Sequence, residues 1–316
     1  MGQTTFSFEI FPPNKESAVE KLTETLDELV GLSPDFISVT CTNKNDDLAR
    51  LTVKLAGYVK NKLDVPSIAH LPAAYLDKQQ VSEILNELET LGVTNLLALR
   101  GDCIEGRKPK DDFRHASDLI AYVHENFPEF HISAACYPEI HPESDSRVDD
   151  IKHLKYKTDQ GVDSLITQMF FDNESFYGFK ECCELADINT PIVAGIMPIV
   201  KRNQALRILK TSSATLPKKF TAILNKYRDD PESLKAAGLA YAIDQIVDLV
   251  TQGVAGIHLY TMNDAETAKY IWQATRSLAS RTLVRWPPLK SVTSRSRPRS
   301  RRPKARATSS TFASMV

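Results

Sequence analysis

The sequence predicts a single α/β domain folded as an eight-stranded (β/α)8 TIM barrel, followed by a basic, disordered C-terminal tail. Short apolar segments alternate with longer amphipathic ones along the first 275 residues, the pattern of strands that are each followed by a helix. Eight such strands are predicted, and eight regular repeats close naturally into a barrel. A doubly wound open sheet is the alternative fold, but no Gly-x-Gly-x-x-Gly turn follows any predicted strand.

The predicted strands are short runs rich in apolar residues. In chain order they cover Phe6–Phe11, Asp35–Thr40, Ser67–His70, Asn95–Leu99, His131–Cys136, Ser164–Gln168, Ile192–Ile196 and Gly256–Tyr260. The predicted helices carry apolar residues three or four positions apart. They cover Ser17–Leu32, Asp46–Leu63, Asp77–Leu91, Ala116–Asn126, Arg147–Gln160, Glu174–Asp187, Lys201–Ser212, Pro217–Gln252 and Ala265–Ala274. Capping residues support these limits, such as Asp77 at one helix start and Gly92 after the same helix.

Composition excludes several classes of protein. No run of 18 apolar residues occurs in the 316-residue chain, so no membrane span is predicted. The N-terminus has no basic segment followed by an apolar run, so no secretory signal is predicted. The five cysteines are an odd number without the spacing of a metal or redox pair. They predict reduced thiols in a cytoplasmic protein.

The last part of the chain differs in charge from the rest. Between Arg276 and Val316 there are eleven Lys or Arg residues and no Asp or Glu, which leaves the first 275 residues with a net charge of −12. The segment lacks an apolar period, so we expect an acidic barrel domain over 1–275 and a disordered Ser/Arg/Pro-rich tail over 276–316. Such a tail can bind phosphates, but the abrupt change within the last predicted helix is equally typical of a frameshifted or artificial end. Nucleic acid is therefore not a predicted partner.

Polar residues gather at the carboxyl ends of the predicted strands. Barrel enzymes carry their chemistry at this rim and in the loops that follow it. Seven of the eight strands place a polar or ionisable group there: Glu9, Thr40, His70, Arg100 with Asp102, Tyr137 with His141, Gln168, and Tyr260. A barrel kept only for stability does not need this set, so the rim is the predicted functional site.

Glu9 is the candidate general acid. Alternation along the first strand turns Phe6, Phe8 and Ile10 towards the helices and leaves Ser7, Glu9 and Phe11 facing the barrel interior. Burial beside Phe11 favours the protonated form of a carboxyl group, as a general acid near neutral pH requires. The alternative is a structural carboxylate paired with a lysine or arginine, but no such residue stands out among the inward strand positions.

Two loops and one helix face add further candidates. In Leu99-Arg100-Gly101-Asp102, the glycine permits close approach to a flat ligand and the arginine offers a planar cation. Two prolines stiffen the loop from Tyr137 to Glu143. Asp150, His153 and Lys157 share one helix face. No metal site is predicted, because His70 and His141 have no third ligand at a suitable spacing.

Together these motifs resemble the methylenetetrahydrofolate reductase family. The resemblance covers residues 6 to about 275, in the family's order. Four strings carry it: Phe8-Glu9-Ile10-Phe11-Pro12-Pro13, Leu99-Arg100-Gly101-Asp102, Tyr137-Pro138-Glu139-Ile140-His141-Pro142-Glu143, and Thr167-Gln168-Met169-Phe170-Phe171-Asp172.

The resemblance implies an FAD enzyme, reduced by NADH or NADPH and reoxidised by 5,10-methylenetetrahydrofolate, which becomes 5-methyltetrahydrofolate. Glu9 matches the family's general acid, and Asp102 is the second catalytic candidate. Asp102, Gln168 and Gln204 match positions that meet the folate. The implied flavin residues are Thr40, His70, Arg100, Gly101, Asp102, Ala116, Tyr137, His141, Ser144, Asp150, His153 and Lys157. Homo-oligomers are common in the family, and nothing in the sequence decides between NADH and NADPH.

The chain departs from the family at some positions. The family has asparagine where His153 stands, and the well-known bacterial members carry a folate-contacting arginine where Asp264 stands. An acidic side chain cannot make that contact, so Asp264 is not a candidate site residue. Two other functions stay open. One is a different flavin barrel, such as a proline-dehydrogenase-like enzyme, and the other is a flavin-free barrel that binds pterins for methyl transfer.

Overall fold

Eight parallel strands close into a barrel. The structure is a computed structural model that describes residues 4–13, 19–41, 46–212 and 214–278. Each strand pairs with the next in chain order, and β8 pairs with β1, so the predicted (β/α)8 fold is confirmed. The strands are β1 Thr5–Ile10, β2 Phe36–Val39, β3 Ser67–Pro72, β4 Asn95–Leu99, β5 His131–Cys136, β6 Ser164–Thr167, β7 Ile192–Ile196 and β8 Gly256–Tyr260. Most of the predicted tail, from residue 279 onwards, lies outside the described residues.

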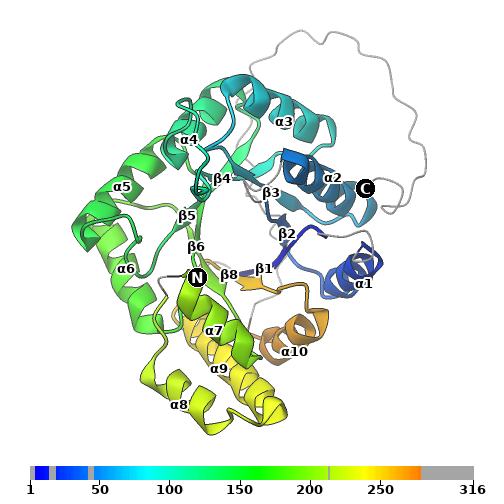
Figure 1. The fold of residues 1–316 in the computed structure, drawn as a ribbon, viewed down its shortest axis with the longest axis vertical. Helices are drawn as coiled ribbons and strands as arrows, with labels where there is room; N and C mark the ends of the chain where they lie inside the picture. Colours follow the sequence, from blue (N-terminus) through cyan, green and yellow to red (C-terminus); the bar gives the residue numbers. More distant parts are fainter. Residues whose placement is uncertain (1–3, 14–18, 42–45, 213, 279–316) are drawn as a thin grey trace.

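Helices surround the strands on the outside (Figure 1). They are α1 Val19–Val30, α2 Asp46–Lys62, α3 Lys78–Thr90, α4 Ala116–Asn126, α5 Arg147–Asp159, α6 Asn173–Leu185, α7 Arg202–Thr211, α8 Lys218–Lys226, α9 Pro231–Thr251 and α10 Ala265–Thr275. The continuous helix predicted over Pro217–Gln252 is wrong, because two helices occupy it. The break lies before Pro231, which takes the first turn of α9 behind the capping side chain of Asp230. Proline is suited to a helix start and disrupts a helix interior.

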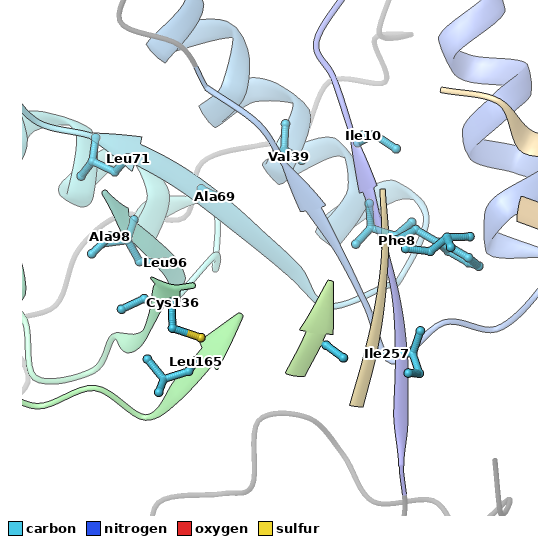
Figure 2. Packing of buried hydrophobic residues seen from close by; sticks show 14 of the residues in the cluster. Phe8, Ile10, Val39, Ala69, Leu71, Leu96, Ala98, Cys136, Leu165 and Ile257 are labelled. Atoms are coloured by element: carbon cyan, nitrogen blue, oxygen red, sulfur yellow. The ribbon is translucent and has the colours of Figure 1, made fainter. Parts of the chain in front are cut away.

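The strands alternate between two apolar layers. Figure 2 shows the layer between the strands and the helices, with Phe8, Ile10 and Leu165 among the labelled side chains. Complete burial of a side chain such as Phe8 contributes about 1.5–3 kcal/mol. A second cluster of Phe36, Ile68, Leu97, Ile166 and Val193 packs separately from the first. The register places Ser38 and His70 two residues beyond Phe36 and Ile68. Polar side chains therefore lie between this second apolar cluster and the carboxyl end of the barrel.

Helices α7 and α8 have a small core of their own. Phe171, Ile199, Ala205, Ile208, Ala214 and Phe220 form this cluster. The loop between the two helices is fastened to the loop after β5, because the Glu139 carboxylate accepts hydrogen bonds from the Thr215 backbone N–H at 2.9 Å and its hydroxyl at 3.0 Å. The α7–α8 unit therefore joins the loops after β5 and β7, both at the carboxyl end of the barrel. We call this unit the cap.

Two further observations concern the chemical setting of the chain. Within the described ranges, no helix has the length and apolar character needed to cross a membrane. Cys103, Cys136, Cys182 and Cys183 are free thiols. The last two are adjacent on α6, where they pack as small side chains in or against the main core.

Candidate active site

Glu9 lies at the mouth of the barrel between two imidazole rings. In the strand register it stands between Ser38 of β2 and Tyr260 of β8, and the residue is 7% exposed. Its Oε2 is 3.6 Å from His70 Nε2 and 3.7 Å from His258 Nε2. From the sequence, the only partner expected for a structural carboxylate here was a lysine or an arginine. Its closest described ionisable neighbours are histidines from β3 and β8.

His70 is held neutral. Its burial lowers the pKa to about 4, an effect larger than the opposing attraction of Glu9. The ring is therefore uncharged near pH 7. In the described part of the chain, His70 Nε2 and the nearby Thr40 Oγ1 are buried without a hydrogen-bond partner. Such orphaned polar atoms are rare in folded proteins, and at a rim they indicate a place for a polar ligand.

His258 is a site residue that was not predicted from the sequence. Its side chain is completely buried, and it stacks on Phe36 with ring centroids 5.6 Å apart. Strand alternation could have found it, because His258 precedes the rim residue Tyr260 by two positions and so faces the same side of β8. The rings of His258 and Tyr260 are in edge contact, with centroids 5.5 Å apart. The Tyr260 hydroxyl donates to the Thr167 carbonyl oxygen at 2.6 Å.

Several predicted flavin residues meet at the end of β5 and the start of α5. The rings of Tyr137 and His141 are in edge contact, with centroids 4.5 Å apart. The Asp150 carboxylate accepts hydrogen bonds from the His141 backbone N–H at 3.4 Å and from the Ser144 hydroxyl at 3.5 Å. Lys157 donates from Nζ to the Ala135 carbonyl oxygen at 2.5 Å. The structure thus brings together five residues that are spread over 21 positions of the sequence.

Burial shifts the protonation equilibria of this group. It raises the pKa of Tyr137 to about 12, and the negative charge of Asp102 adds to the effect. It also raises the pKa of Asp150 and lowers that of Lys157. Burial likewise lowers the pKa of His141. Each shift disfavours the charged form of its group, as expected where water is excluded.

Arg100 connects the loops after β4 and β5. Its guanidinium donates to both carboxylate oxygens of Glu143 at 2.6 Å, and this bond raises the pKa of Arg100 above its ordinary value. Gly101 has φ of 83°, a left-handed conformation that glycine adopts without steric cost. Asp102 follows as an exposed residue. Its influence on the pKa of Tyr137 places it near that ring.

Other predicted residues are less closely associated with this group. Ala116 is half-buried at the first position of α4, and His153 is exposed on α5. Gln168 is exposed, with its amide oxygen accepting from the Met169 backbone N–H at 2.9 Å. Gln204 is turned towards its own loop, where it accepts from Val200 N–H at 3.1 Å and donates to the Pro198 carbonyl oxygen at 2.8 Å.

Asp264, which stands at the position discounted above, has a structural task. It is the N-cap of α10, and its carboxylate accepts a hydrogen bond from the Thr267 backbone N–H at 3.0 Å. An aspartate at this position satisfies an unpaired helix N–H and complements the positive end of the helix dipole. Its replacement of an arginine is therefore compatible with the local backbone.

The residues at the mouth fit a flat polar group such as a flavin. Two orphaned polar atoms lie at the ends of neighbouring strands, Thr40 Oγ1 directly after β2 and His70 Nε2 in β3. Arg100 provides a partly exposed cation, and Gly101 provides backbone without a side chain. A ligand with polar ring edges and an anionic portion matches these donors and the open backbone.

The fold and the residues at the mouth of the barrel define a class of protein. A closed barrel that holds a buried carboxyl group between two imidazoles at its carboxyl end has the features of a barrel enzyme that moves protons. A sequence profile described as methylenetetrahydrofolate reductase matches residues 1–276. The chain belongs to this family.

Individual relatives agree with the family match. The chain is 34% identical over 266 residues to 5,10-methylenetetrahydrofolate reductase of Escherichia coli, covering 84% of this chain and 88% of the relative. It is 34% identical over 281 residues to methylenetetrahydrofolate reductase (NADH) 1 of Arabidopsis thaliana, again covering 84% of this chain. The matched region spans 47% of that plant relative, about half its length.

A solved structure shares the fold. It is an uncharacterised protein from Clostridium thermocellum, described as binding two copies of 5-methyl-5,6,7,8-tetrahydrofolic acid. The TM-score is 0.62 at 13% sequence identity, and the match covers 88% of this chain and 95% of that one. At this identity the likeness supports the barrel fold alone.

Proposed function

We propose that the protein reduces 5,10-methylenetetrahydrofolate to 5-methyltetrahydrofolate through a bound FAD that NAD(P)H reduces first. The observation that carries the proposal is the position of Glu9, a buried carboxyl group at the barrel mouth. Family membership over residues 1–276 supports the reaction. The polar residues around the mouth support a ligand of the size and polarity of a flavin.

The cofactor is proposed to lie across the ends of β2 to β5. Thr40 and His70 would supply the two orphaned polar atoms to it, and Arg100 and Lys157 would face its anionic or electron-rich parts. When bound, the flavin supplies hydride chemistry, accepting a hydride from NAD(P)H and giving it to the folate. Tyr137, His141, Ser144 and Asp150 shape the adjoining wall. Ala116, Gly101 and His153 complete the proposed set.

Glu9 is proposed to open the folate's five-membered ring. The methylene carbon of the substrate is bridged between two nitrogens and resists hydride until one carbon–nitrogen bond breaks. A proton delivered to the leaving nitrogen makes that break possible and leaves an iminium carbon that accepts hydride. A carboxyl group at the barrel mouth can deliver such a proton to a bound substrate. Asp102, Gln168 and Gln204 are proposed to orient the folate, with Gln204 exchanging its loop bonds for substrate bonds.

The proposal extends to the setting of the enzyme. Free thiols at Cys103, Cys136, Cys182 and Cys183 support a reducing compartment such as the cytoplasm. A homo-oligomer is proposed from the family resemblance. Steady-state assays with NADH and with NADPH measure the preferred reductant.

Anaerobic spectroscopy of the purified protein tests the proposal and separates it from its two rivals. The protein is expected to be yellow, to bleach with NADH or NADPH, and to regain its colour when methylenetetrahydrofolate is added. Colour that bleaches but does not return with the folate would indicate another flavin barrel, such as a proline-dehydrogenase-like enzyme. A protein that binds folates but never a flavin would indicate a methyl-transfer module.

Asp102→Asn is expected to retain FAD but to slow the folate half-reaction more than reduction by NAD(P)H. Asp102 acts on the charge of its surroundings, as its effect on Tyr137 shows. A nearby negative charge disfavours the anionic reduced flavin and makes it a stronger hydride donor, so its removal raises the flavin reduction potential. The measurements are a redox titration and stopped-flow rates for each half-reaction.

Asp111→Asn is a suitable control for this variant. It removes the same charge from the same loop, at an exposed carboxylate that pairs with Arg114 at 2.9 Å. We expect its potential and both rates to match the wild type. If Asp102→Asn also leaves the potential and the folate rate unchanged, Asp102 has neither proposed role.

A further inference from the structure

His258 lies beneath Glu9 and has no role in the mechanism proposed above. The ring is completely buried and touches side chains from two neighbouring strands. Ser7 Oγ lies 2.8 Å from Nδ1, while Ser38 Oγ lies 3.2 Å and Glu9 Oε2 3.7 Å from Nε2. Both ring nitrogens therefore face polar atoms. Buried polar atoms in folded proteins are nearly always paired, and these contacts from β1 and β2 hold the ring in one orientation beside Glu9.

The hydrogen bonds of Ser7 select the tautomer of the ring. The Ser7 hydroxyl donates its proton to the Ile257 carbonyl oxygen at 3.2 Å. With the hydroxyl proton used in this bond, its oxygen accepts at the 2.8 Å contact, and on this basis we assign the hydrogen of the neutral ring to His258 Nδ1. In the neutral ring, Nε2 is then the basic nitrogen, and it faces Glu9 and Ser38. The serine thus orients the proton-accepting atom towards the proposed acid.

We propose that His258 stores the proton that Glu9 delivers to the substrate, with Ser7 as the residue that fixes its tautomer. The inference rests on the proposed role of Glu9 as the general acid. His258 does not touch the folate in this scheme and acts through Glu9, so it is a positioning and proton-supplying residue.

In this scheme the proton moves from His258 through Glu9 to the substrate and is then replaced from solvent. The scheme places the proton of the pair on His258 Nε2 and leaves Glu9 as a carboxylate before the substrate reacts. When the folate binds, the 3.7 Å separation of Nε2 and Glu9 Oε2 shortens to a hydrogen bond. As the folate ring opens, the Nε2–H bond breaks, the proton passes through Glu9, and a new N–H bond forms on the leaving nitrogen. His258 becomes neutral, Glu9 is again a carboxylate, and the positive charge resides on the substrate iminium. One solvent proton, entering through Glu9 at the mouth, restores the pair for the next turnover.

The other ionisable groups around His258 are compatible with this role. His70 from β3 faces the same Glu9 oxygen at 3.6 Å, but burial lowers its pKa to about 4 and keeps it neutral. Tyr260 on β8 has a pKa raised far above its usual value, chiefly by burial. Neither group therefore competes for the stored proton near pH 7. Of the two imidazoles beside Glu9, His258 is the one with a defined basic nitrogen.

The decisive variants are His258→Gln and Ser7→Ala, each assayed as the flavin-loaded protein. Glutamine keeps hydrogen-bonding capacity but cannot store a proton. We expect His258→Gln to slow the folate half-reaction by about 10- to 100-fold, less than loss of Glu9 itself, since Glu9 can still collect a proton from solvent. Flavin reduction by NADH is expected within about twofold of wild type. The pH profile of the folate rate is expected to differ from that of wild type, because one of the two groups that handle the proton has been removed.

Nitrogen NMR of histidine-labelled protein provides a readout that does not depend on turnover. The signal lost in His258→Gln identifies this ring among the seven histidines. Wild type is expected to show a protonated Nδ1, and Ser7→Ala is expected to lose that protected N–H. Ser133→Ala is the matched control, since it removes a buried strand hydroxyl that contacts Ser164 at 2.8 Å instead. It should leave the His258 signal and the folate rate unchanged.

The outcomes distinguish failure of this inference from failure of the proposed function. If Glu9→Gln is slow with folate while His258→Gln has the wild-type rate and pH profile, the relay is wrong and the acid stands. If Glu9→Gln itself reduces folate at the wild-type rate, the proposed acid is wrong. Equal slowing of both half-reactions in His258→Gln, or an unprotonated Nδ1 in wild type, would overturn the relay. A folding defect in His258→Gln would be recognised by lost flavin, and Ser7→Ala then decides the question.

Discussion

Glu9→Gln is expected to slow the reduction of methylenetetrahydrofolate by about 10²–10⁴-fold, the usual effect of removing a positioned general acid. Reduction of the flavin by NADH needs no proton on a folate nitrogen, so that half-reaction is expected to stay within a few-fold of wild type. Glutamine has nearly the shape of glutamate and can still contact His70 and His258. Stopped-flow measurement of each half-reaction separates the two expectations.

Glu9→Asp is the matched control for this prediction. Aspartate keeps an acidic proton but withdraws it by one methylene group, so we expect a folate rate between those of wild type and Glu9→Gln. Equal slowing of both half-reactions in Glu9→Gln would instead assign Glu9 to structure or binding. An unaffected folate rate would move the acid to another residue.

Gly238→Ala is expected to destabilise the protein by about 1–3 kcal/mol, the usual range for overpacking a filled interior. Gly238 lies in α9, and a Cβ there would stand 1.9 Å from the Ile199 backbone oxygen. Ile199 belongs to the segment between β7 and α7 that Gln204 holds through Val200 and Pro198. Displacement of this segment is also expected to raise KM for the folate more than KM for NADH. Urea unfolding and steady-state kinetics measure the two effects.

Gly178→Ala is the opposite case in a similar element. Gly178 lies in α6, is exposed, and has no heavy atom within 4 Å of its would-be Cβ. Here alanine removes backbone entropy from the unfolded chain without steric cost, so a gain of about 0.5–1 kcal/mol is expected. If Gly238→Ala and Gly178→Ala change the free energy of unfolding alike, the close approach of α9 to Ile199 does not constrain the cap formed by α7 and α8.

Much of the fold follows from local patterns in the sequence. Short apolar runs alternate with longer amphipathic segments along the sequence. This alternation predicts all eight strands within a few residues, because each strand is short, buried and followed by an amphipathic helix. The prediction was wrong where a local signal was overlooked. Pro231 stood inside a predicted helix, although a proline ends or begins a helix more readily than it continues one. The separate core beneath α7 and α8 could not be predicted, since it depends on contacts between distant segments.

The candidate site was predictable in its members more than in its contacts. Strand-end positions identified Glu9, His70 and Arg100 individually, because the fold sends all strand ends to one rim. The pairing of Arg100 with Glu143 depends on loop geometry that no spacing rule describes. His258 was not predicted, because the candidate residues were taken only from the carboxyl ends of the strands and the loops that follow. A residue two positions earlier also faces inwards and here lies beside Glu9.

The seam between the first and last strands has a consequence for the synthesis of the chain. Ser7 and His258 are 251 residues apart, and the Thr261 hydroxyl reaches the Glu9 carbonyl oxygen across 252 residues. Contacts of such sequence separation carry a large loop-closure cost and form slowly compared with helices. While the β8 segment of a nascent chain is still inside the ribosome, Glu9 therefore lacks the histidine that is proposed to supply its proton. The contact between Glu9 and His258 is made only when β8 pairs with β1 and closes the barrel.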